Sequence, residues 1–175
     1  MLPPAMRGGA LNTRGIFLLA ALLAGLLLAA GCGGSSGSSG DEITVETGSL
    51  SKAKFIAKAD AICEGARTEF LQKYTSFVEA HKADLGDKQK EEALLGEMLE
   101  TILGPNLEGQ IKQISHLGAP KDYAPQVEAF LSALQQRIDE AQGNPVELTA
   151  TATPFKKAED AARKAGMNGC AESLS

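Results

Sequence analysis

Residues 51–83 read SKAKFIAKADAICEGARTEFLQKYTSFVEAHKA, and this stretch decides the fold that we expect for the chain. Apolar side chains recur in it at spacings of three and four residues, which gathers them on one face of an α-helix. They are Phe55, Ala59, Ile62, Cys63, Ala66, Phe70, Tyr74, Phe77 and Val78. Ser49 or Ser51 is a suitable N-cap, because a serine hydroxyl accepts from a free amide of the first turn. The pattern predicts one long helix that ends near Ala83.

A second helix is expected to begin after Asp87, which is a good N-cap. Its apolar stripe has two parts, and Gly104-Pro105 separates them. The first part is Leu94, Leu95, Met98, Leu99 and Ile102, and the second is Leu107, Ile111, Ile114 and Leu117. Because proline cannot donate to the helical ladder, either one helix kinks at Pro105 or two helices meet there. We expect a break with near-continuation, followed by a firm stop at Gly118-Ala119-Pro120.

Two further helices complete the expected fold. The third begins within residues 121–125 and ends at Gly143-Asn144-Pro145; its inward face is Val127, Phe130, Leu131, Leu134, Ile138 and Ala141. Residues 146–153 read as a loop. Thr153 is the expected N-cap of the fourth helix, with Pro154 at its first position and Gly166 at its end with positive φ. The inward face of this helix is Phe155, Ala158, Ala162 and Ala165. The sequence therefore predicts an all-α, up-and-down bundle of about four helices, the second broken near Pro105.

The N-terminal residues 1–31 have the pattern of a secretory signal peptide. Arg7 and Arg14 precede the apolar run of residues 15–30, and small residues end that run. An uncleaved membrane helix is the alternative, although the run is at the short end for a span of about 20 residues. Met6 is an alternative start, since Met6-Arg7 would begin a more usual signal peptide.

Leu28-Ala29-Ala30-Gly31-Cys32 resembles a bacterial lipobox, with Ala29 where leucine is preferred. The resemblance implies cleavage before Cys32 and attachment of diacylglycerol to its sulfur, so that acyl chains such as palmitate hold the protein on the membrane. A simple secreted form is the alternative. After Cys32 the chain is rich in glycine and serine, and we assign residues 32–49 to the lipidated cysteine and a flexible tether. The helical domain is then expected to comprise residues 50–175.

Cys63 and Cys170 are the two cysteines left for the domain. An even count in an oxidising compartment favours a disulfide between them. The bond would join the first helix to a short C-terminal tail and close a long loop, which constrains the unfolded chain. Two free thiols or a redox pair are the alternatives, although a redox pair normally has the spacing Cys-x-x-Cys.

Composition and charge argue against several classes of function. The chain has a net charge of −5, and without Arg7 and Arg14 the 17 basic residues fall to 15 against 22 acidic ones. A protein that binds nucleic acid needs a basic face to neutralise phosphates, so nucleic acid is not an expected partner. There is no tryptophan, and aromatic residues make up 5% of the chain, which argues against an aromatic sugar or base platform.

Catalytic and metal-binding motifs were sought and not found. His81 and His116 lie in neither His-Glu-x-x-His nor Glu-x-x-His, and we expect both to be surface residues. The carboxylates of the second helix, which are Glu91, Glu92, Glu97, Glu100 and Glu108, are expected to form a solvated face. We therefore expect no catalytic residue, no metal ion and no cofactor.

Short motifs carry a resemblance to a group of uncharacterised small actinobacterial secreted proteins and lipoproteins. The motifs are Ser51-Lys52-Ala53-Lys54-Phe55, Ala59-Asp60-Ala61-Ile62-Cys63, Leu117-Gly118-Ala119-Pro120 and Ala165-Gly166-Met167-Asn168-Gly169-Cys170. The likeness covers about residues 50–171. It implies a helical domain with one cysteine in the first helix and one near the C-terminus, and it implies no particular activity.

Three hypotheses of function follow. The leading one is a non-enzymatic, lipid-anchored domain on the outer face of the cytoplasmic membrane, which binds or scaffolds an envelope protein. The second is a bundle that binds a small ligand near the Pro105 break, in a cavity lined by Met98, Ile102 and Phe130. The third is an enzyme, which would need a deep pocket that gathers His116 with several carboxylates.

Overall fold

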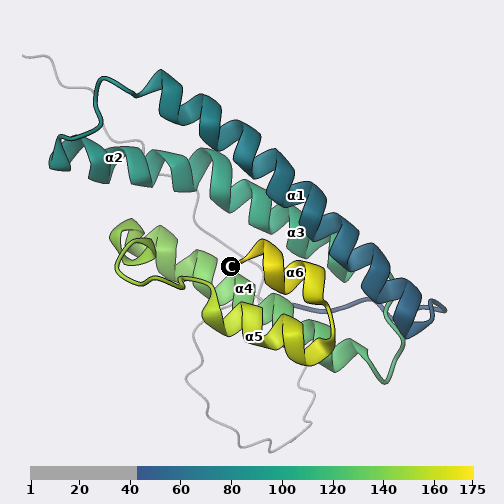
Figure 1. Ribbon diagram of the computed structural model, residues 1–175. Coiled ribbons are helices and arrows are strands. Elements are labelled where there is room, and N and C mark those ends of the chain that lie inside the picture. The colour runs from purple at the N-terminus through teal and green to yellow at the C-terminus, as the bar shows by residue number, and fades with distance from the viewer. Residues whose placement is uncertain (1–42) are drawn as a thin grey trace, which may run out of the picture. The chain divides into compact units, whose positions relative to one another are not determined.

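The computed structural model describes residues 43–175 (Figure 1). The predicted signal peptide, the lipidation site Cys32 and the tether up to residue 42 lie outside the described residues. The elements are, in chain order, α1 Lys52–Ala80, α2 Lys88–Met98, the π-helix η1 Leu99–Leu103, α3 Gly104–Ser115, α4 Ala124–Gly143, the 3-10 helix η2 Pro145–Leu148, α5 Lys156–Ala165 and α6 Asn168–Ser173. The prediction of an all-α bundle is confirmed for this part of the chain.

Five of the helices close into a ring around the main core. Neighbours in this ring are α1 and α3, α3 and α4, α4 and α5, α5 and α6, and finally α6 and α1. Figure 1 shows α1 beside the long α2–α3 helix, with α4, α5 and α6 below them. Each helix of the ring therefore packs against two neighbours, which is the arrangement of a helical bundle, whereas α2 has no buried residue.

The predicted N-cap of α1 is present, since the Ser51 Oγ accepts a hydrogen bond from the Lys54 amide at 3.4 Å. The first half of α1 faces the core, where Phe55, Ala59 and Cys63 are fully buried. The helix ends at Ala80, three residues before the predicted end, and the His81 amide donates to the Phe77 carbonyl at 3.1 Å.

The interruption predicted near Pro105 is a π-helical turn that joins α2 to α3. Pro105 has no amide hydrogen for the carbonyl four residues before it. The chain instead takes one wider turn, in which the Gly104 amide donates to the Leu99 carbonyl five residues back. A Cβ at position 104 would lie 2.8 Å from that carbonyl oxygen, so glycine is required there. The helix thus continues through the Gly104-Pro105 interruption.

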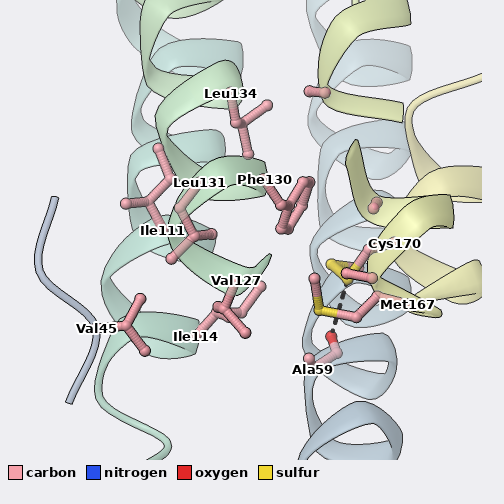
Figure 2. Close-up of a cluster of buried hydrophobic side chains, with 14 of the residues drawn as sticks. Val45, Ala59, Ile111, Ile114, Val127, Phe130, Leu131, Leu134, Met167 and Cys170 are labelled. Carbon is pink, nitrogen blue, oxygen red and sulfur yellow. Dashed lines mark hydrogen bonds between the residues drawn. A yellow bond between two sulfur atoms is a disulfide. The ribbon is translucent and has the colours of Figure 1, made fainter. Parts of the chain in front are cut away.

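The core is densest around α4 (Figure 2). Val127, Phe130, Leu131 and Leu134 of this helix are fully buried. Figure 2 shows Phe130 directed toward Met167 and Cys170, while Leu131 lies near Ile111 of α3. Tyr123, just before α4, is also buried, and its hydroxyl donates to the carbonyl of Ala165 at 2.7 Å. Burial raises the pKa of Tyr123 to about 12, and the nearby carboxylate of Asp60 adds to the effect.

Residues 43–49 belong to the domain, so their assignment to the tether is wrong. Val45 is buried in the main core, and the Glu46 amide donates to the Ser115 carbonyl at 2.8 Å. Ala119 then donates to the Glu46 carbonyl and accepts from the Gly48 amide, each at 2.8 Å. The end of α3 and the turn after it have backbone N–H and C=O groups without a helical partner, and this extended segment forms hydrogen bonds with them.

The region after α4 differs from the prediction in three places. The first residues of the loop expected at 146–153 belong to the 3-10 helix η2, where the Thr149 amide donates to the Val146 carbonyl. The helix predicted to start at Thr153 starts at Lys156, because residues 153–156 form a turn in which the Lys156 amide donates to the Thr153 carbonyl. The expected C-terminal tail is the short helix α6. The positive φ predicted for Gly166 is confirmed, at 83°.

Candidate functional site

The predicted disulfide joins Cys63 to Cys170 and therefore links α1 to α6. The two Cα atoms are 5.0 Å apart, and the bond spans 107 positions of the sequence. The Sγ of Cys170 lies 3.4 Å from the carbonyl oxygen of Ala59 (Figure 2). The Asp60 Oδ1 accepts from the Cys170 amide at 3.0 Å. Both sulfurs are fully buried, so the bond is a structural staple with no access for a redox partner.

The two histidines lie in different parts of the domain. His81 follows the end of α1, where its ring centroid lies 4.4 Å from that of Phe77 with the two rings tilted by 39°. Its Nε2 lies 3.9 Å from the Glu97 carboxylate. His116 follows α3, is exposed, and has its Nε2 3.6 Å from the Glu46 carboxylate. No group of three or more metal-ligating side chains occurs within residues 43–175. The described structure therefore gathers no histidine with several carboxylates.

The three residues predicted to line a cavity at the Pro105 break are not brought together. Phe130 is fully buried in the main core, and Ile102 is 8% exposed. Met98 instead faces an open cleft between α1 and α2. A different hollow of about 440 Å³ lies beside Pro105, where Glu100 and Glu108 of the acidic run form part of its rim.

An open, mainly apolar cleft lies between α1, α2 and η2, and we call it the α1–α2 cleft. Its volume is about 640 Å³. Close backbone packing joins α1 to η1, α3 and α6, whereas α1 and α2 hardly approach each other. Eight of the thirteen lining residues are apolar or aromatic, and they are Tyr74, Phe77, Val78, Leu85, Leu94, Leu95, Met98 and Val146. A concave, mainly apolar site of this size is typical of a ligand-binding pocket.

Large hydrophobic side chains that remain exposed gather at the same end of the domain. Leu71, Tyr74, Leu85 and Val146 are each between 41% and 48% exposed. Three of these four line the α1–α2 cleft, and Leu71 of α1 lies outside it. An apolar surface of this kind, rimmed by charges, is typical of an interaction site.

The cleft exists because α1 extends beyond α6, the helix that covers its first half. With 29 residues α1 is about 44 Å long, whereas α6, with 6 residues, is about 9 Å long. No helix of the described chain lies over the second half of α1 as α6 lies over the first. Residues that the sequence assigns to one buried stripe are therefore only partly covered beyond Ala66. Unequal helix lengths were the signal in the sequence that could have revealed the cleft.

The charged residues at the mouth of the cleft lie near the turn between α1 and α2. Lys90 donates to Asp84 at 2.6 Å and holds the pKa of that carboxyl below its ordinary value. Glu91 accepts from the Gly86 amide at 2.8 Å. Lys88 and Glu92 also line the cleft, and neither makes an ion pair or a side-chain hydrogen bond to another residue of the 43–175 region.

Comparison with protein-family models, with curated proteins and with solved structures finds no significant match to the chain. Among the helices of residues 43–175, none has both the length and the apolar character that crossing a membrane requires.

Proposed function

We propose that the protein is a lipid-anchored, extracytoplasmic binding module, held on the outer face of the cytoplasmic membrane through Cys32. The α1–α2 cleft is its binding site, and the occupant presents an apolar group. The observation that carries this proposal is the open, 640 Å³ cleft lined mainly by apolar side chains. An occupant that covers these side chains would gain about 25 cal/mol of binding free energy for each Å² of apolar surface removed from water.

The packing of α1 supports a binding role because it holds one wall of the cleft in place. Preorganised sites lose less entropy when a ligand binds. The first half of α1 packs closely on α3 and α6. The second half of the same continuous helix forms one wall of the cleft.

A site-specific crosslink in cells tests the proposal. Leu85 and Leu71 are each 48% exposed, and only Leu85 lines the cleft. A benzophenone amino acid in place of Leu85 should crosslink an occupant in the native envelope, and mass spectrometry would show whether the adduct is a lipid or a protein. The same replacement at Leu71 is the matched control. Equal adduct patterns at the two positions would contradict a binding role for the cleft.

Membrane fractionation tests the anchor separately. Cys32→Ala should move the protein from the membrane fraction to the soluble fraction, because acyl chains on the cysteine are the proposed attachment. Retention of Cys32→Ala on membranes would contradict lipid anchoring, whatever the crosslinking result.

A further inference from the structure

We infer that the occupant of the α1–α2 cleft is a single-chain amphiphile with a zwitterionic head group. This inference rests on the binding role proposed above and names the chemistry of the ligand. It follows from the size of the cleft, from the separation of its apolar and polar parts, and from the two opposite charges at its mouth.

The dimensions of the cleft suit one alkyl chain. The cleft holds about 640 Å³, which is within the range of small-molecule pockets. It follows α2 from Lys88 to Met98, a rise of about 15 Å. That length is half the hydrocarbon thickness of a bilayer of about 30 Å, and so matches one acyl chain.

Polarity changes along the cleft from one end to the other. Lys88, Glu91 and Glu92 lie in the first turns of α2, next to the connecting turn. Met98, at the far end of the same helix, faces the cleft together with Val146 of η2. An amphiphile would therefore place its head at the turn and its chain toward η2.

The charged residues at the mouth favour a head group that carries one positive and one negative charge. Lys88 and Glu92 are four positions apart on α2, which puts them on the same helical face. Neither has a charged partner within 4 Å among the described residues, whereas Lys90 is paired with Asp84. A phosphate and an ammonium on one head group would pair with Lys88 and Glu92 together. An anionic head would meet the carboxylates of Glu91 and Glu92.

Titration calorimetry with defined amphiphiles below their micelle-forming concentrations tests this inference on the purified domain. The probes are dodecylphosphocholine, laurate and dodecyltrimethylammonium, which share a chain length and differ in head charge. We expect dodecylphosphocholine to bind most tightly. Shortening its chain should weaken binding roughly twofold to fourfold for each methylene removed. Equal affinities for the three heads would overturn the assignment of the head group.

Matched variants locate the bound probe. Val146→Glu puts a carboxylate at the η2 end of the cleft, where the alkyl chain would lie, and should weaken dodecylphosphocholine binding by about tenfold or more. Leu71→Glu, outside the cleft and of similar exposure (48% against 41%), should leave the affinity unchanged. Lys88→Gln and Glu92→Gln should each weaken binding about twofold to fivefold, and less at high salt. Equal effects of Val146→Glu and Leu71→Glu would overturn the site.

The outcomes separate the ligand chemistry from the binding role. If no amphiphile binds while position 85 still crosslinks a protein in cells, the ligand inference fails and the binding role stands. A dimer of the purified domain, broken by Leu85→Glu and kept by Leu71→Glu, would place a second copy in the cleft and overturn the inference as well.

Discussion

The two halves of α1 carry the same apolar stripe but differ in how far that stripe is buried. Phe55 in the first half is fully buried, whereas Tyr74 in the second half is 42% exposed. The first half contacts α6 and carries the disulfide, and the second half forms one wall of the open cleft. Helical periodicity is identical in both halves, so burial depends on what the rest of the chain supplies as a cover.

This difference separates stability from binding within one helix. Apolar surface that is covered inside the domain stabilises the fold, and apolar surface left open is free to stabilise a complex. The stapled half, which comprises residues 52–66 with α6 and the start of α4, should therefore dominate unfolding. The open half, which comprises residues 67–80 with α2, should dominate recognition.

The sharpest test of the comparison replaces one phenylalanine in each half. Phe55→Ala removes a fully buried ring that packs edge-on against Tyr123 at 5.6 Å, and should lower the free energy of unfolding by about 3–5 kcal/mol. Phe77→Ala removes a ring that is only partly covered, and should cost about 1 kcal/mol. Urea denaturation measures both values. Similar losses for the two variants would show that the open half is not a separate region.

The disulfide provides a second test of the stapled half. Replacing both Cys63 and Cys170 with alanine should lower the free energy of unfolding by about 2–4 kcal/mol, because the cross-link closes a loop spanning 107 positions. Removing both cysteines avoids leaving one free thiol. Binding at the cleft, measured by calorimetry with dodecylphosphocholine, should change less than twofold at a temperature where the variant is folded. A large loss of binding by a folded variant would show that the staple reaches into the open half.

Local signals explain which parts of the fold the sequence predicts. Ser51 and Asp87 cap their helices as expected, because a cap is decided by a side chain and amides two or three positions away. Gly166 has the expected positive φ, and the interruption at Gly104-Pro105 follows from the missing amide hydrogen of proline. The disulfide was predictable from the even number of cysteines that remains when Cys32 is set aside as the expected lipidation site.

Features that depend on distant partners escaped prediction. Val45 is buried only because the turn after α3 offers backbone groups to residues 46–48, and no property of the short segment itself reveals that partner. The cleft was missed for a related reason. Periodicity marks Phe77 and Leu95 as apolar-face residues, but only the relative lengths of α1 and α6 show that no helix of the described chain covers the end of α1.

The smallest expected effect concerns Tyr123, which connects α4 to α5 inside the stapled half. Tyr123→Phe removes the hydrogen bond to the Ala165 carbonyl and should cost about 1–2 kcal/mol at pH 7. The pH dependence is more specific. Because folding raises the pKa of Tyr123 from 10.0 to about 12, the phenol contributes a stability that is complete below pH 10 and is lost as pH rises toward 12.

Denaturation of the wild type and of Tyr123→Phe between pH 9 and pH 12 measures that contribution. The advantage of the wild type should shrink by roughly 1 kcal/mol at pH 11, since the unfolded tyrosine ionises while the folded one stays protonated. A constant difference for Tyr123→Phe would mean that water reaches the ring of Tyr123, and the contrast between the two halves of α1 would then be weaker than their packing indicates.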